Sequence, residues 1–267
     1  MKNRIRMVLG LMALATAPVA AQTPFQEMFK FEGILPNDPT ILVNTGSGSF
    51  YAYSSPYYGG LAPLSSPTNY VNNLLIWCVD ETHEAFVGQI YEAWITPLSA
   101  TAANFGHTRQ GGAAKNNYEW AAYLAGSMNL NWGPGPNQAI NQSNSVALQD
   151  AMWALLDEGA NDNAREAAFR NSTLAASLGI PPTSNGSFDF DTSALPAGFD
   201  DSGWFLISCD PNGRPTCGTG YGQEFLVRLP AGTGTSVTPE PATLSLLGTG
   251  IAGVMGMGMR RRKKRSA

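Results

Sequence analysis

The basic residues of the chain lie mainly at its two ends, and this segregation leaves an acidic segment in the middle to form the fold. Of the 16 Lys and Arg residues, three fall within positions 1–6 and six form the cluster 260–265. The segment from Gln22 to Pro241 holds seven basic residues against all 20 acidic ones. A segment this acidic repels the phosphates of nucleic acids and anionic membrane surfaces. We therefore expect an acidic central domain with no nucleic-acid partner, and two terminal segments with separate roles.

The N-terminal segment 1–21 has the three parts of a secretory signal peptide. Basic residues come first, an apolar run extends over 7–15, and small residues occupy Val19, Ala20 and Ala21. This order is typical of a segment that directs export and is then removed. An amphipathic first helix of the fold is the alternative, but such a helix would show polar residues at helical spacing. The sequence therefore predicts that the central domain lies outside the cytoplasm.

The C-terminal segment predicts one membrane-spanning helix. Residues 242–259 include no charged residue, and the basic cluster 260–265 follows at once. Eighteen residues at about 1.5 Å each make a helix of about 27 Å, just long enough for the hydrocarbon core of a bilayer. The Lys and Arg residues after this span are expected to stay in the cytoplasm. Five glycines make the segment a weak permanent anchor, which suits a disposable sorting signal.

Pro239, Glu240 and Pro241 stand immediately before this span. The Pro-Glu-Pro sequence, the short span and the Arg-rich terminus together resemble the PEP-CTERM sorting signal of Gram-negative bacteria. The resemblance implies an inner-membrane-anchored precursor, processing by an exosortase, and then a place at the cell surface or in the extracellular matrix. The predicted organisation is a signal peptide at 1–21, an extracytoplasmic domain at 22–236 and a sorting signal at 237–267. A simple tail anchor is the alternative.

The central domain combines strand-like and helix-like patterns. Short strands and loops are expected over 22–67, and further strands over 74–79, 89–95, 204–209 and 224–229. Helices are expected over 118–125, over 146–158 with Ser145 as its N-terminal cap, and over 163–178. Because strands enclose the helices, the predicted fold class is α+β: a turn-rich β-sheet or barrel-like domain with an inserted helical subdomain.

The chain has three cysteines, which cannot all pair within one molecule. Cys209 and Cys217 flank a Pro-Asn-Gly turn, and export permits a disulfide between them. Cys78 is then left over, at the end of the strand predicted over 74–79. An unpaired thiol in an oxidising compartment must be buried, paired between chains or used chemically.

Gln149 occupies a core-facing position of the helix predicted over 146–158. It shares one helical face with Met152, Trp153 and Leu156, which follow at the spacing of that face. A buried primary amide without hydrogen bonds costs about 2 kcal/mol or more. Gln149 therefore needs either hydrogen-bond partners or a covalent bond.

Two segments together resemble the paired signatures of bacterial surface thioester domains: Trp77-Cys78-Val79-Asp80 and, later, Leu148-Gln149-Asp150-Ala151-Met152-Trp153. In that family the Cys sulfur and the Gln side-chain carbon are joined as an internal thioester. The resemblance implies that Cys78 and Gln149 lie side by side, with Trp77, Asp80 and Trp153 in support and the two tryptophans shielding the bond. It also implies covalent attachment to amine-bearing surface or matrix molecules, by one acyl transfer rather than by enzymatic turnover.

Other interpretations stay open. A non-reactive secreted matrix or biofilm protein, structural or binding, would hold Cys78 and Gln149 only as packed residues. A cysteine hydrolase would need a histidine beside Cys78, and the chain has only His83 and His107. A metal site at His83 lacks a second His or Cys nearby, and no cofactor-binding motif is present. We therefore expect neither a metal nor a cofactor.

Overall fold

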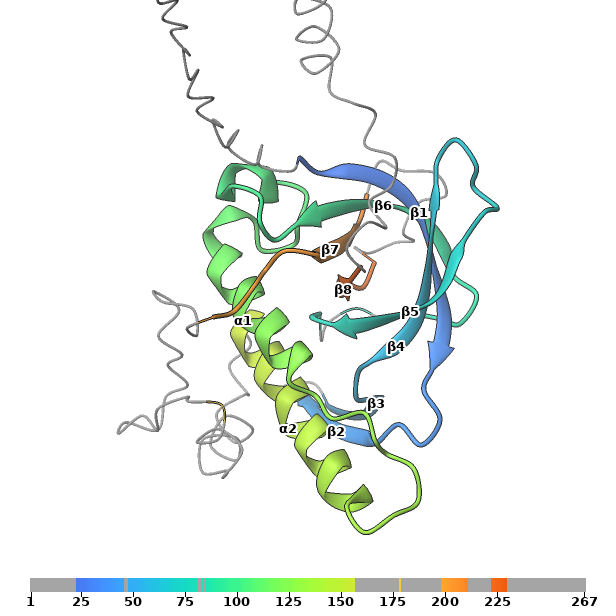
Figure 1. Ribbon diagram of the computed structural model, residues 1–267, viewed down its shortest axis with the longest axis vertical. Coiled ribbons are helices and arrows are strands. Elements are labelled where there is room, and N and C mark those ends of the chain that lie inside the picture. Colours follow the sequence, from blue (N-terminus) through green and yellow to red (C-terminus); the bar gives the residue numbers. More distant parts are fainter. Residues whose placement is uncertain are drawn as a thin grey trace, which may run out of the picture. The chain divides into compact units, whose positions relative to one another are not determined.

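The computed structural model describes residues 23–45, 48–80, 83, 85–156, 178, 198–210 and 222–229 (Figure 1). The chain divides into two compact units, Met1–Arg228 and Leu229–Ala267. Several predicted features lie outside the described residues: the signal peptide, all but the last residue of the helix predicted over 163–178, Cys217, and the sorting signal with its span over 242–259. Within the described ranges, no helix is both long enough and apolar enough to cross a membrane.

Six antiparallel strands close into a barrel in the order β1-β4-β5-β8-β7-β6. Their bounds are β1 Phe25–Ile34, β4 Tyr57–Pro63, β5 Val71–Cys78, β6 Ile90–Pro97, β7 Trp204–Cys209 and β8 Phe225–Arg228. Closure pairs every strand of this sheet on both sides, so the barrel has no unpaired edge. The chain therefore returns after residue 198 to complete a sheet that began at Phe25.

A separate hairpin of β2 (Thr40–Thr45) and β3 (Gly48–Tyr53) lies between β1 and β4 in the chain. The short link from Ser54 to Pro56 joins this hairpin to barrel strand β4. The main-chain nitrogen of Ser54 donates to the oxygen of Pro39 at 2.8 Å, which closes the base of the hairpin. This bond fixes the position of the link, which becomes important for the site.

The helices are inserted between β6 and β7 and run along one side of the barrel (Figure 1). Two 3₁₀ turns, η1 Ala102–Phe105 and η2 Gly112–Ala114, precede α1 Lys115–Gly126 and α2 Gln138–Leu156. A barrel followed by inserted helices agrees with the predicted α+β architecture.

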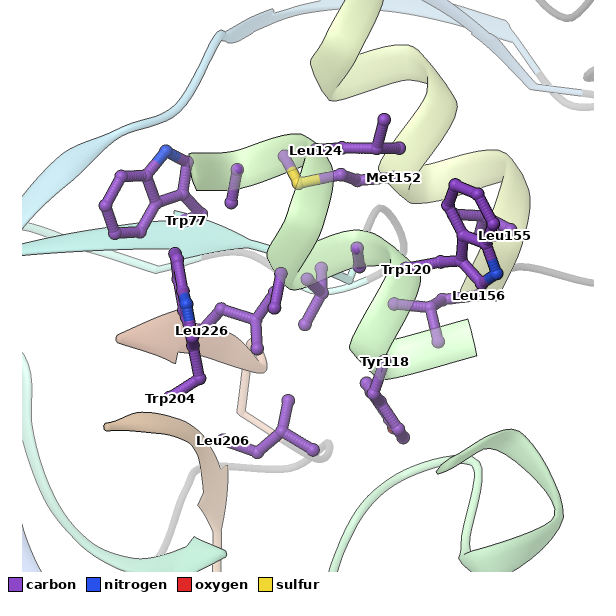
Figure 2. Close-up of a cluster of buried hydrophobic side chains, with 14 of the residues drawn as sticks. Trp77, Tyr118, Trp120, Leu124, Met152, Leu155, Leu156, Trp204, Leu206 and Leu226 are labelled. Atoms are coloured by element: carbon purple, nitrogen blue, oxygen red, sulfur yellow. The ribbon is translucent and has the colours of Figure 1, made fainter. Parts of the chain in front are cut away.

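The core has two layers because successive residues of a strand point to opposite faces. Inside the barrel, aromatic rings from four strands meet: Phe29, Phe31, Tyr57, Tyr91 and Phe225. On the outer face, Trp77, Trp204 and Leu226 pack with Leu124 and Met152 of the helices (Figure 2). Cys78 follows Trp77 and so takes the opposite face of β5.

The prediction for the second helix was wrong at its start. The helix begins at Gln138 rather than Val146, so Ser145 lies inside it and is not its cap. The buried Ser145 hydroxyl instead accepts a hydrogen bond from the Trp132 indole nitrogen at 3.0 Å. The first two turns are rich in Asn, Gln and Ser and show no apolar periodicity. They are held by tertiary bonds such as that from Asn141 Nδ2 to the oxygen of Asn131 at 2.8 Å.

Candidate functional site

The structure brings Cys78 and Gln149 together at the end of β5. Both residues are fully buried, and Cys78 is a free thiol. The side-chain nitrogen of Gln149 donates to the main-chain oxygen of Cys78 at 2.8 Å, across 71 residues of sequence. The buried Gln149 amide thus has hydrogen-bond partners. One of them is the main chain of Cys78, the residue that the thioester-like motifs pair with Gln149.

Ser55 connects these two residues. Its main-chain nitrogen donates to Gln149 Oε1 at 3.2 Å, and its hydroxyl oxygen accepts from the main-chain nitrogen of Cys78 at 2.7 Å. Ser55 is itself fully buried in the link before β4. One residue therefore orients both the carboxamide of Gln149 and the main chain that carries the thiol.

Within the described part of the chain, the sulfur of Cys78 forms hydrogen bonds with Asp80 and Gln223. The thiol donates to the main-chain oxygen of Asp80 at 3.1 Å, and Gln223 Nε2 donates to the sulfur at 2.8 Å. The same Gln223 nitrogen also reaches the oxygen of Asp80 at 3.1 Å. Gln223 is half-buried, whereas the sulfur that it contacts belongs to a fully buried residue.

Burial, with a smaller contribution from the charge of Asp80, raises the pKa of the Cys78 thiol to about 12. The sulfur is therefore protonated at neutral pH. A cysteine hydrolase relies on a thiolate whose pKa is lowered by a neighbouring cation. The surroundings of Cys78 act in the opposite direction, so they do not favour hydrolase chemistry.

Each of the two histidines has a contact away from the sulfur. His83 Nδ1 lies 2.7 Å from Asp80 Oδ2, and the His107 ring stacks on Trp94 with 3.7 Å between ring centroids. Over the described ranges, no group of three or more His, Cys, Asp and Glu residues could hold a metal ion.

Asp80 ties the Cys78 segment to the end of α2. Its carboxylate is completely buried, forms an ion pair with Arg109 and lies within hydrogen-bond distance of His83. Arg109 also donates through Nη2 to the main-chain oxygen of Leu156, at 3.3 Å. The buried Asp80 carboxylate is therefore balanced by Arg109. The same Arg109 side chain also binds a carbonyl at the end of α2, the helix that carries Gln149.

Glu224 holds the strand that brings Gln223 to the sulfur. Its buried carboxylate accepts hydrogen bonds from the hydroxyls of Ser208 and Tyr118, each at 2.5 Å, and from the Arg109 main chain at 3.0 Å. Burial nevertheless raises the pKa of Glu224. The main-chain oxygen of Glu224 accepts from Val79 at 3.0 Å, next to Cys78.

Tyr57 and Asp38 lie in the neighbourhood of Cys78. The Tyr57 hydroxyl donates to the main-chain oxygen of Tyr53. Burial raises the pKa of Tyr57, and the nearby Cys78 and Asp38 raise it further. Burial also raises the pKa of Asp38 to about 8, and within the described structure neither of its carboxyl oxygens has a hydrogen-bond partner. The surroundings of the site are therefore poorly hydrated.

The other predicted residues have different positions. Trp153 lies in α2, where its indole acts on the pKa of the Cys78 thiol, whereas Trp77 packs against Trp204 in the outer cluster. Cys209 is buried at the end of β7, and its predicted partner Cys217 lies outside the described residues, so that disulfide stays a prediction.

Ser55 and Gln223 were not predicted from the sequence as residues of the site. The Ser-Ser-Pro sequence at 54–56 has the composition of an ordinary turn, and Gln223 directly precedes a predicted strand. Neither position carries a motif of its own. Only the closure of the barrel places them beside Cys78.

Comparison with known proteins identifies the C-terminal segment. A family model for the PEP-CTERM protein-sorting motif matches residues 237–263, which confirms the motif predicted at Pro239, Glu240 and Pro241. No curated protein and no solved structure matches the chain significantly. Exosortases recognise PEP-CTERM signals. The chain therefore carries a PEP-CTERM sorting motif and is a secreted protein, anchored at the membrane before exosortase processing.

Proposed function

We propose that this protein attaches covalently to amine-bearing molecules of the cell surface or extracellular matrix through an internal thioester between Cys78 and Gln149. The observation that carries the proposal is the contact between the buried Gln149 amide and the main chain of Cys78. Ser55 supports this contact, because it forms hydrogen bonds with both residues. The sorting motif supports it, because it delivers the chain to the outside of the cell. A Gram-negative host and the surface location belong to the same proposal.

The chemistry consists of two acyl transfers. The Cys78 sulfur adds to the side-chain carbon of Gln149, the carbon–nitrogen bond breaks, and the amide nitrogen leaves as ammonia after taking up the thiol proton. An amine on the target then adds to the thioester carbon. The carbon–sulfur bond breaks, an amide forms, and the proton lost by the amine restores the thiol. Each molecule forms one bond and does not turn over, so the protein is not an enzyme in the usual sense.

The burial of the sulfur supports a stored thioester. The pKa of the Cys78 thiol is raised to about 12, chiefly by burial, so the corresponding thiolate is a poor leaving group. Water reaches a fully buried bond slowly, and the half-buried Gln223 packs against the sulfur. Both features protect a thioester from hydrolysis until an amine enters.

A non-reactive secreted matrix protein is the second candidate, and one observation favours it. Both side-chain atoms of the Gln149 amide have hydrogen bonds in the uncoupled state, to Cys78 and to Ser55. The buried amide is therefore satisfied without a covalent bond. In that case the Cys78 and Gln149 pair serves packing alone.

Intact mass of the exported protein, purified from producing cells, separates the two candidates. A thioester makes the mass one ammonia lower than the sequence mass, after allowance for hydrogens lost to any disulfide. Methylamine should then add to Gln149 and release a thiol at Cys78. The Cys78→Ala variant should have the full sequence mass and take up no methylamine. A folded wild-type protein of full sequence mass that takes up no amine would favour the non-reactive protein.

A further inference from the structure

The indole nitrogen of Trp153 is a buried donor without a partner in the described part of the chain. The Trp153 side chain is almost completely buried, so this N–H group is shielded from bulk solvent. An unpaired buried donor is destabilising, and folded proteins retain few of them. The structure with free Cys78 and Gln149 therefore does not explain why this buried donor is retained.

Trp153 stands beside the reacting groups of the proposed thioester. It follows Gln149 by four residues in α2, so the two side chains lie on the same face of the helix. Burial raises the pKa of the Cys78 thiol, and the nearby Trp153 side chain lowers it, although the indole nitrogen forms no hydrogen bond within the described residues. The Trp153 indole thus lies near Cys78 and on the same helical face as the Gln149 carboxamide.

A second donor already points at the oxygen that would become charged. The main-chain nitrogen of Ser55 donates to Gln149 Oε1 at 3.2 Å, which is longer than the usual N–H···O distance of about 2.9–3.0 Å. Hydrogen bonds shorten and strengthen when the acceptor gains negative charge. The Ser55 N–H is therefore placed to bind this oxygen more strongly in a transition state than in the ground state.

We propose that the main-chain N–H of Ser55 and the indole N–H of Trp153 form an oxyanion hole for acyl transfer at Gln149. This inference rests on the proposed thioester function. When the sulfur adds to the Gln149 carbon, the electron pair of the C=O double bond moves onto Oε1. The two donors stabilise that negative charge, and the pair returns to the carbonyl as ammonia leaves. The same charge develops when an amine later adds to the thioester carbon, so both steps use the same two donors.

Trp77 supplies a matched control. Its indole nitrogen is also buried, and it too has no partner within the described residues. However, Trp77 lies on the outer face of β5, where its ring packs against Trp204 with 5.3 Å between ring centroids (Figure 2). Replacement by Phe removes the same N–H group and a similar volume from both positions. Only the change at Trp153 removes a donor from the reacting atoms.

The test compares Trp153→Phe with Trp77→Phe in the exported protein purified from producing cells. The measured quantities are the fraction of molecules lacking one ammonia and the rate of methylamine incorporation at Gln149, followed by mass spectrometry. Loss of one oxyanion donor is expected to slow incorporation by about 10²-fold in Trp153→Phe and by less than about threefold in Trp77→Phe. Equal rates in the two variants would overturn the oxyanion hole.

A second variant covers the case in which Trp153→Phe does not fold. Benzothienylalanine at position 153 keeps the shape of tryptophan and replaces the N–H group by sulfur. With ¹³C-labelled glutamine, the thioester carbonyl stretch should move to higher frequency in this variant, because the carbonyl has lost a hydrogen bond. An unchanged frequency, with an unchanged rate of methylamine incorporation, would also overturn the inference.

The outcomes separate the inference from the function on which it rests. If the folded wild-type protein has its full sequence mass and takes up no methylamine, the thioester itself is absent. If the wild-type protein reacts and the Trp153 variants react at the same rate, the thioester stands and the oxyanion hole fails.

Discussion

Gln149 donates its side-chain amide to the main-chain oxygen of Cys78 at 2.8 Å, although 71 residues separate them. The contact joins the end of barrel strand β5 to the inner face of α2. Ser55, from a third segment, binds both residues through its main-chain nitrogen and its hydroxyl. Three distant parts of the chain thus meet at one carboxamide, which makes the geometry of this contact sensitive to each of them.

Replacement of Ser55 should affect both stability and reactivity. Ser55→Ala removes the acceptor of the buried Cys78 N–H and leaves that donor unsatisfied, at a cost of about 1–3 kcal/mol in the free energy of unfolding. Urea unfolding measures this loss, and methylamine incorporation should slow because the Cys78 main chain is less firmly held. Ser54→Ala is the control, since Ser54 is equally buried but its hydroxyl makes only a 3.4 Å contact with a neighbouring carbonyl. Equal effects of the two changes would contradict the role given to Ser55.

Arg109 should be required for the burial of Asp80. Arg109→Met removes a cation from a carboxylate that has no solvent exposure, and we expect a loss of about 3 kcal/mol in the free energy of unfolding. Addition of Asp80→Asn to this variant should restore part of the loss, because a neutral amide needs no counter-charge. Chemical denaturation of the two variants tests this. A single variant within about 0.5 kcal/mol of the wild type would show that the ion pair is not needed.

Glu27 should make stability depend on pH. Its side chain is buried on the same face of β1 as Phe29 and Phe31, and burial raises the pKa of Glu27 to about 7. The folded state therefore holds this proton more tightly than the unfolded state, so stability falls as pH rises from about 4.5 to about 7. Glu27→Gln should be more stable than the wild type by about 1–3 kcal/mol at pH 8 and equally stable near pH 4. Thermal unfolding across this pH range measures the difference, and parallel curves for the two proteins would refute the assignment.

Cys209 and Cys217 should form a disulfide that leaves Cys78 out. Cys78 is a free thiol in the structure, and Cys209 lies at the end of β7, two residues before the Pro-Asn-Gly sequence that starts at 211. Peptide mapping without reduction should recover the peptides of Cys209 and Cys217 linked to each other. Recovery of Cys78 linked to either one would contradict this pairing and would also remove the thiol that the proposed thioester requires.

The basic cluster 260–265 should control processing rather than export. Replacement of its six residues by neutral ones removes the charges that are expected to keep this end in the cytoplasm, while the predicted signal peptide is unchanged. We expect the variant to be exported but incorrectly oriented or incompletely processed. Cell fractionation and mass analysis of the C-terminus measure this. Normal processing of the variant would count against a role for the cluster in sorting.

The sequence by itself determined the linear signals and the local periodicities. The sorting motif at 237–263 is read as a short stretch of chain, so its recognition needs no tertiary information. The strands 74–79 and 204–209 were predicted nearly as observed, because continuous apolar runs of strand length need burial on both faces. The start of α2 was missed because its first two turns are held by tertiary hydrogen bonds and not by an apolar face.

Only the tertiary structure decided which groups surround Cys78. Ser55 precedes β4, Gln223 precedes β8, and both reach the site because β5 pairs with β4 on one side and with β8 on the other. Strand order and register depend on how the whole barrel closes, so no local pattern at 55 or 223 records them. The same closure buries the sulfur and sets its pKa, since desolvation depends on every segment packed around the thiol and not on the residues beside it in the chain.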